Sequence, residues 1–220
     1  MNAAPVGWWA AAVAVVAGLS PLLAGWTVAL ESGVTSRWWQ PRRSSGSRLM
    51  VTAGVAVVLA AAALQAAAPW PAEVILAAVG TVLALVDVRV HLLPARLVWP
   101  MAGALAVVLT GTAAWGGHWP DLMRAATAAG VVGGGWLVVA FLAPAAIGLG
   151  DVRLLAVTAA VLGWVGWAAV LGGQLLTFMA AGVTAVALAL MRPAGDDRRG
   201  QVPMGPAIVV GTVLAGWLLG

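Results

Sequence analysis

Long uninterrupted runs of apolar residues, separated by short charged segments, dominate the chain. No charged side chain occurs in residues 1–30, 49–72, 74–86, 97–120, 125–150, 154–191 or 200–220. A helix needs roughly 20 apolar residues to cross the hydrocarbon core of a bilayer. Backbone groups in lipid must be satisfied within each segment, whereas a β-barrel would show short alternating segments. The pattern therefore predicts transmembrane α-helices.

One run is too long for a single crossing. As one helix, residues 154–191 would extend about 57 Å at ~1.5 Å per residue, so we expect it to fold back once, at Gly163, Gly166 or Gly172–Gly173. The fold class is then all-α, a polytopic transmembrane helical bundle forming a single membrane domain over residues 1–220. About eight helices are expected, at 7–30, 49–68, 71–88, 97–115, 124–147, 152–165, 168–191 and 204–220.

Composition supports this fold and excludes several functions. The chain is 63% hydrophobic and 8% charged, with a mean hydropathy of +1.02, whereas soluble domains carry about 25% charged residues. The absence of cysteine excludes disulfides, thiol catalysis and cysteine-ligated zinc. The 11 basic residues are all arginines and lie between apolar runs, so we expect a lipid bilayer and no nucleic acid as partner.

The arginines also predict an orientation, because cytoplasmic loops are enriched in basic residues. If the amino terminus lies outside, ten arginines face the cytoplasm and Arg124 alone lies outside. This asymmetry requires the fold-back, and it places both termini outside the cytoplasm. It also places Asp87 and Asp151 at the cytoplasmic ends of two helices. The histidines, His91 and His118, fall on opposite sides, so no metal site is expected.

Two of the seven acidic residues border long apolar runs near membrane depth, where an ionisable group is costly. Asp87 could simply pair with Arg89 or Arg96, and Asp151 could simply cap the helix that follows it. The remaining five are expected to be solvated surface charges: Glu31, Glu73, Asp121, Asp196 and Asp197.

Three motifs favour a catalytic role for the two aspartates. Residues 148–155 read Gly-Leu-Gly-Asp-Val-Arg-Leu-Leu, residues 87–94 read Asp-Val-Arg-Val-His-Leu-Leu-Pro, and residues 203–206 read Pro-Met-Gly-Pro. Together they resemble the G-x-G-D-x-K-L-L, D-x5-L-P and P-x-G-P elements of the type IV prepilin peptidases, a GxGD-type family of membrane aspartyl proteases. The resemblance covers residues 71–220, following a first helix and a short basic loop in 1–48.

This resemblance implies an aspartic endopeptidase of the bacterial cytoplasmic membrane, which cleaves the leader of a prepilin or pseudopilin precursor at the cytoplasmic face without a cofactor. Asp87 and Asp151 would be catalytic. Gly148, Gly150, Arg153, Pro203, Gly205 and Pro206 would line the substrate cleft. Ala95 stands where many members carry an acid, and Arg153 replaces the usual lysine. Because segment 31–48 is short and lacks cysteine, the N-methyltransferase activity of bifunctional members is not implied.

Paired carboxyl groups suit peptide hydrolysis without a metal. One ionised carboxyl takes a proton from water while the other, protonated, donates to the substrate carbonyl. Two close carboxylates cannot both ionise cheaply, so the pair titrates as a unit, and the sequence does not identify the base. Gly148 and Gly150 would let the backbone approach a substrate strand. For Pro203 and Pro206, a simple helix start is the alternative.

Two other functions fit the same residues. Asp87 and Asp151 could form the ion relay of a proton- or ion-coupled transporter, which would need a charge near the membrane midplane. The chain could also be an inactive relative that assists pilus assembly. The sequence predicts neither the particular pilin nor the oligomeric state.

The orientation can be tested with reporter fusions. Fusions at residues 45, 94 and 200 should all report the cytoplasm, since each position lies in an arginine-bearing segment. A periplasmic signal at residue 200 alone would contradict the proposed orientation of the last two helices.

Overall fold

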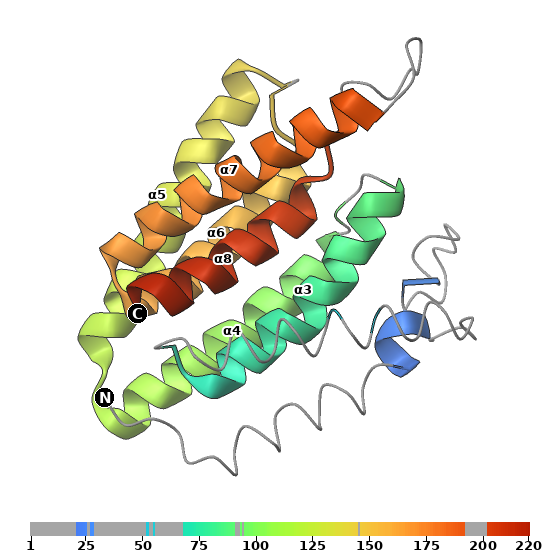
Figure 1. Cartoon of the computed structure of the whole chain (residues 1–220). Coiled ribbons are helices and arrows are strands. Elements are labelled where there is room, and N and C mark those ends of the chain that lie inside the picture. Colours follow the sequence, from blue (N-terminus) through green and yellow to red (C-terminus); the bar gives the residue numbers. More distant parts are fainter. Residues whose placement is uncertain are drawn as a thin grey trace.

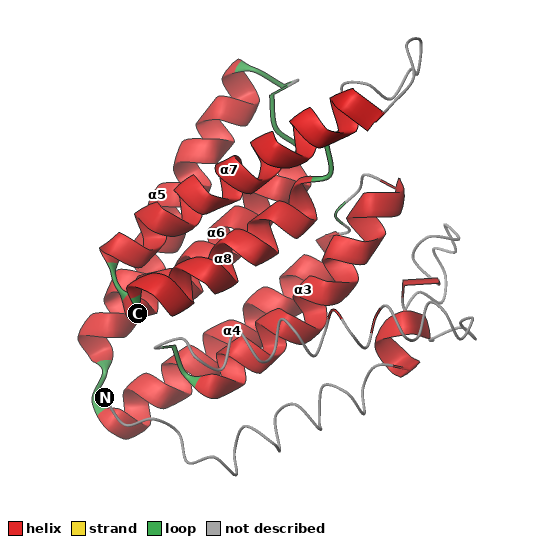
Figure 2. Ribbon diagram, viewed as in Figure 1, coloured by secondary structure: helices red, strands yellow, loops and turns green. Residues whose placement is uncertain are grey.

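A computed structural model describes residues 21–25, 27–28, 52, 55, 68–90, 93, 95–144, 146–191 and 202–220. Within these ranges the chain consists of helices and short connections, and they contain no strand (Figure 2). The all-α class predicted from the apolar runs is confirmed. The helices expected at 7–30 and 49–68, and the basic loop at 41–48, lie almost entirely outside the described residues.

Six long helices are described in full: α3 (Trp70–Val90), α4 (Ala95–Gly116), α5 (Trp119–Leu142), α6 (Leu149–Val165), α7 (Trp167–Met191) and α8 (Met204–Leu219). Five of them begin within three residues of the predicted position. The exception is α5, which begins five residues early because Pro120 is tolerated in its first turn. It also ends at Leu142 rather than at residue 147, because Ala143 precedes Pro144 and a residue before proline disfavours the helical conformation.

The six helices alternate in direction, so their ends gather at two ends of the bundle (Figure 1). We name them the aspartate end, which holds the carboxyl end of α3 and the amino ends of α6 and α8, and the tryptophan end. At the tryptophan end, exposed tryptophans occupy helix termini: Trp70, Trp115, Trp119, Trp167 and Trp217. Tryptophan is typical of the membrane–water interface, so this ring marks one membrane surface.

Four helices in the described part of the chain are long and apolar enough to cross a membrane: 70–89, 95–116, 119–142 and 167–191. The core lies where α3, α6 and α8 meet, and it contains fully buried side chains such as Leu83, Leu155 and Ile208. In contrast, α5 and α7 expose large apolar side chains along most of their length. That distribution suits a lipid solvent, and the protein is a membrane protein. Buried threonines satisfy their hydroxyls within their own helices, as Thr81 does with the Ala77 carbonyl at 2.6 Å.

The fold-back predicted within residues 154–191 is confirmed, and it lies at Gly166 between α6 and α7. The other candidate glycines serve helix packing instead. A Cβ atom on Gly163 would lie 2.7 Å from the Ala128 Cβ of α5, and one on Gly173 would lie within van der Waals distance of the Leu162 side chain. Small residues let transmembrane helices approach closely, so these positions bring α5, α6 and α7 together.

Arg124 of α5 secures this fold-back. Its guanidinium donates hydrogen bonds to the carbonyls of Gly163 at 2.6 Å, of Trp164, and of Val165 at 3.4 Å. These are carbonyls of the last turn of α6, which have no partner within the helix. Asp121 holds the guanidinium in place through an Oδ1–Nη2 contact of 2.8 Å. The one arginine that the sequence places outside the cytoplasm therefore has a structural role.

Replacing Arg124 with alanine should destabilise the protein without altering its site. Hydrogen bonds from charged groups contribute about 1.5–3 kcal/mol each, so we expect the free energy of unfolding to fall by about 2–4 kcal/mol. Denaturation in detergent micelles, followed by circular dichroism, measures the change. Arg124→Lys should fall between wild type and alanine, since lysine keeps the charge but loses the planar fork. Equal stability of Arg124→Ala and wild type would contradict this role.

Candidate active site

Asp87 lies near the carboxyl end of α3 and is 4% exposed. Its Oδ2 accepts a hydrogen bond of 2.7 Å from the backbone N–H of Gly205, in the first turn of α8. This N–H is one of the donors at the start of a helix that lack an intrahelical partner. The N-cap residue of α8 is Pro203, which has no side-chain acceptor to offer. The carboxylate of Asp87 therefore supplies, from another helix, an acceptor that a capping residue would normally provide.

Asp151 occupies the third position of α6, after the N-cap residue Gly148. Its carboxylate accepts a hydrogen bond from the Gly148 backbone N–H. This is the side-chain half of a capping box, in which the N3 carboxylate reaches back to the N-cap. The simple alternative, with Asp151 itself as the cap, is wrong, because Gly148 holds that position. Gly148 has no room for a larger residue, since its Cβ would lie 3.0 Å from the Asp151 Oδ2.

The two carboxyl groups interact electrostatically across the aspartate end. A second contact joins the same segments: a Cβ on Gly150 would lie 2.9 Å from the Leu93 Cβ and 3.0 Å from the Leu93 carbonyl oxygen. Leu93 belongs to the Asp-x5-Leu-Pro segment and Gly150 precedes Asp151. Leu93, three residues after the end of α3, therefore lies directly against the start of α6.

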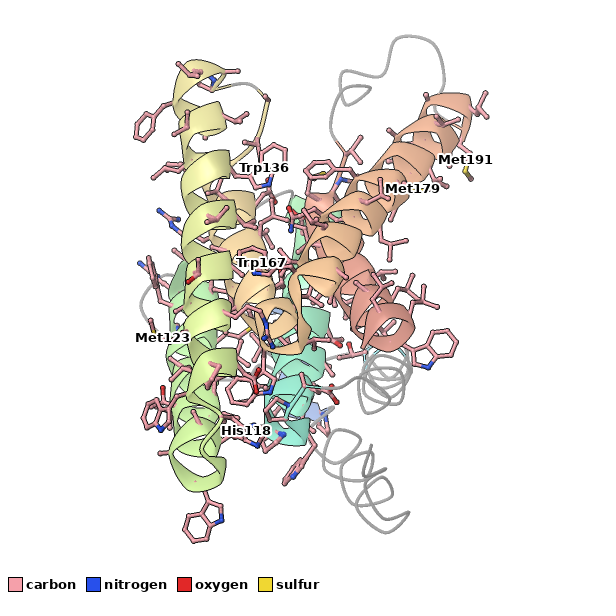
Figure 3. All side chains as sticks on the ribbon, turned by 90° about the vertical axis from the view of Figure 1, so that its left-hand side faces the viewer. His118, Met123, Trp136, Trp167, Met179 and Met191 are labelled. Carbon is pink, nitrogen blue, oxygen red and sulfur yellow. The ribbon has the colours of Figure 1, made fainter. Side chains whose placement is uncertain are left out.

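The structure thus brings all three sequence motifs to one place. The element 203–206 meets Asp87 through Gly205, and Asp87 and Asp151 interact with each other. Pro203, Pro206 and Arg153 are half-buried at the same end of the bundle. Pro203 also begins α8, so the helix-start interpretation of this element holds alongside its contact with Asp87. His91 lies outside the described residues, and His118 lies at the start of α5, at the tryptophan end (Figure 3).

Sequence reasoning missed two backbone donors and one packing contact. The donors are the N–H groups of Gly205 and Gly148, and the contact is that of Leu93 with Gly150. The sequence interpretation gives Gly148 and Gly150 the role of letting the backbone approach a substrate strand, and it gives Gly205 only a place in the cleft lining. In the structure, another group of the protein lies close to each of positions 148, 150 and 205, in the space that a side chain would need. The sequence does contain a signal for these donors. Both donor glycines lie at or near predicted helix starts, and every helix start has backbone N–H groups that lack an intrahelical partner and can bind a carboxylate.

The expectation that five acids are solvated surface charges is wrong for Glu73, which is 2% exposed in the first turn of α3. Asp121 is also not freely solvated, because it pairs with Arg124 and its Oδ2 lies 3.3 Å from the His118 Nδ1. Glu31, Asp196 and Asp197 lie outside the described residues. Among the described residues no group of three or more histidine, aspartate or glutamate side chains is arranged to hold a metal ion.

A family model matches this chain over residues 74–190, just over half of its length. The matched region includes Asp87, the Asp-x5-Leu-Pro segment and the Gly-Leu-Gly-Asp turn. The chain belongs to the type IV leader peptidase family. The match ends before residues 203–206, so the contact of Gly205 with Asp87 is an observation from this structure. No curated protein and no solved structure matches the chain significantly.

Membership of the type IV leader peptidase family makes this protein a membrane-embedded peptidase. It confirms the resemblance drawn from the three motifs. It also gives a chemical context to the carboxyl pair, which lies inside the matched region and at one end of the bundle.

Gly205→Ala should impair this peptidase without unfolding it. The new Cβ would lie 3.0 Å from the Asp87 Cβ and 3.1 Å from its Oδ2, so the carboxyl must move. A displacement of about 1 Å at a reacting group can cost on the order of 100-fold in rate, so we expect kcat to fall by about 10–100-fold with KM little changed. Steady-state cleavage of a leader-bearing precursor measures both.

Gly182→Ala is the matched control, because a Cβ there meets nothing within 4 Å. That variant should cleave at the wild-type rate. Full activity of Gly205→Ala would mean that the position of Asp87 does not limit the reaction.

Proposed function

We propose that this protein is an aspartic endopeptidase that cleaves the leader peptide of type IV prepilin-like or pseudopilin precursors at the cytoplasmic face of the inner membrane. The observation that carries the proposal is the electrostatic interaction of Asp87 with Asp151 inside the matched region. Each of these two aspartates lies in one of the sequence motifs that resemble the family. Both termini would lie outside the cytoplasm, as the arginine distribution predicts.

The proposed chemistry uses the pair as one unit. The ionised carboxyl accepts a proton from a water molecule, whose oxygen attacks the scissile carbonyl, and the protonated carboxyl donates to the carbonyl oxygen. Each aspartate has one backbone donor, from Gly205 or Gly148, that holds a carboxyl oxygen in place. These donors would hold the two carboxyl groups in position for a shared water and for the substrate.

The location of the pair suits cleavage of a leader peptide at the membrane surface. Both aspartates lie at helix ends rather than half-way along a helix, so they can meet water and an extended peptide at the membrane surface. An ion carrier would need a charge near the midplane, which neither aspartate supplies. Arg153, two residues after Asp151, would bias the ionisation of the pair and contribute to the substrate cleft with Gly148, Gly150, Pro203, Gly205 and Pro206.

Asp87→Asn and Asp151→Asn should each abolish leader cleavage while leaving the protein folded in the membrane. Asparagine preserves size but can serve neither as base nor as acid. Because the carboxyls act together, the double variant should be no worse than either single variant. Co-expression with candidate precursors, followed by electrophoresis and mass spectrometry of the product, measures cleavage.

Asp121→Asn is the control, since its carboxyl lies at the tryptophan end, and it should retain near wild-type cleavage. Arg153→Ala should reduce cleavage less severely than the aspartate variants. If either Asp87→Asn or Asp151→Asn kept substantial activity, the two-aspartate mechanism would be wrong. If wild type cleaved no precursor, an inactive relative in pilus assembly would become the better interpretation.

A further inference from the structure

A second buried carboxyl lies at the opposite end of the three helices that carry the candidate active site. Glu73 is in the first turn of α3, three residues after the exposed Trp70, yet its side chain is 2% exposed. One carboxyl oxygen accepts a hydrogen bond from the Ala68 backbone N–H. The other, Oε1, has no hydrogen-bond partner among the described residues. An unpaired polar atom that is withdrawn from water costs about 1–3 kcal/mol, and more if it is charged.

The carboxyl faces a small cavity between α3, α6 and α8. Leu76 of α3 lines it, together with Val161, Leu162 and Val165 of α6 and Thr212, Val213 and Gly216 of α8. The space open to the centre of a water molecule is about 10 Å³, which is close to the minimum that one water needs. Apart from Glu73, the only side-chain polar atom in this lining is the hydroxyl of Thr212.

That hydroxyl can offer the cavity only an acceptor. Thr212 Oγ1 donates its one hydrogen to the Ile208 carbonyl at 2.7 Å, so toward any other group it can act only through its lone pairs. An acceptor-only carboxylate and an accepting hydroxyl cannot satisfy one another. A protonated carboxyl can donate to a water molecule, and that water can donate in turn to Thr212.

Among the described residues, no charged side chain on the helices around Glu73 compensates its ionised carboxyl. Helix α8 has no titratable side chain, and the charged residues of α6, Asp151 and Arg153, lie in its first two turns at the aspartate end. On α3, Asp87 and Arg89 also lie at that end. Arg124 reaches the Val165 carbonyl from α5, but it is bound to Asp121, which contacts His118. A hard cation such as Ca²⁺ takes about 6–8 oxygen ligands, far more than this lining offers.

We propose that Glu73 is a proton-binding site, in which the neutral carboxylic acid and the Thr212 hydroxyl hold one water molecule between α3, α6 and α8. With the proton bound, α3, α6 and α8 pack tightly against one another at the tryptophan end. Loss of the proton leaves an uncompensated charge in an apolar cavity and weakens this packing. The site is separate from the carboxyl pair, so it does not rest on the proposed peptidase mechanism.

Infrared difference spectroscopy of the full-length protein in lipid bilayers tests the protonation state directly. The wild-type minus Glu73→Gln spectrum at neutral pH should contain the carbonyl stretch of a protonated carboxylic acid. Asp121→Asn is the matched control, because its partly exposed, arginine-paired carboxyl should give carboxylate bands instead. Carboxylate bands for Glu73 would overturn the proposal.

Thr212→Val tests the bound water without altering Glu73. Valine has nearly the shape of threonine but cannot accept a hydrogen bond, so the carbonyl stretch of Glu73 should shift in frequency. The same measurement applies if Glu73→Gln fails to fold. An unchanged stretch would exclude Thr212 from the site.

Thermal stability gives an independent test. Between about pH 6 and about pH 9 the melting temperature of wild type should fall more than that of Glu73→Gln, because only wild type has a proton to lose at this position. Both proteins keep Asp87 and Asp151, so titration of the pair cancels in the comparison. A constant difference across this range would overturn the proposal. These measurements need no substrate, so their failure would leave the proposed cleavage activity untouched.

Discussion

A carboxylate that is withdrawn from water must find hydrogen-bond donors inside the protein, and this constraint organises the aspartate end of the bundle. Lipid offers no donor, and most N–H groups of a helix are already used within it. Only the first turn of a helix has free N–H groups. Asp87 receives its donor from the start of α8, and Asp151 receives one from the start of its own helix. Both carboxyls therefore depend on where helix starts are placed.

Helix starts also favour negative charge, because the peptide dipoles give them a partial positive charge. Each aspartate has one such start beside it, and this partial positive charge favours the ionised form of each carboxyl. Glycine lets the carboxyl approach the helix start. A Cβ on Gly205 or Gly148 would lie about 3 Å from the carboxyl group that binds the N–H of the same glycine. The glycines of the three motifs thus determine how near the carboxyls come to their donors.

Most of this fold could be predicted from the sequence. The uncharged runs indicate α3 to α8, and Gly166 falls within the expected fold-back, because length and apolarity alone decide whether a segment can span a bilayer. The motifs indicate Asp87 and Asp151. The error at α5 arose because its limits follow from Pro120 and Pro144 rather than from charge. The local sequence does contain this information, because the known effects of proline on helices predict both ends of α5.

Glu73 could not be predicted in the same way. One acid in the first turn of a helix is an ordinary feature, since negative charge there is favourable and usually solvated. Its burial follows from the last turn of α6, from Val161 onward, and from α8, which come more than 80 residues later in the chain and pack over that turn. Arg124 presents the same difficulty, because the carbonyls it binds belong to residues 163–165. Only tertiary packing brings these partners together.

Helix α8 contacts both buried carboxyls. Its first turn binds Asp87, and its second half, from Thr212 to Gly216, lines the cavity beside Glu73. At the middle of the helix, Gly211 packs so closely on α7 that a Cβ there would lie 2.6 Å from the Thr177 backbone nitrogen. Helix α8 is therefore fixed against α7 at its middle, between its contact with Asp87 and most of its contact with the Glu73 cavity. A shift of α8 along its axis would alter both contacts together, whereas a side-chain change at one end would alter only one. For this reason the position of α8, more than any single side chain, determines how the carboxyl of Asp87 is held.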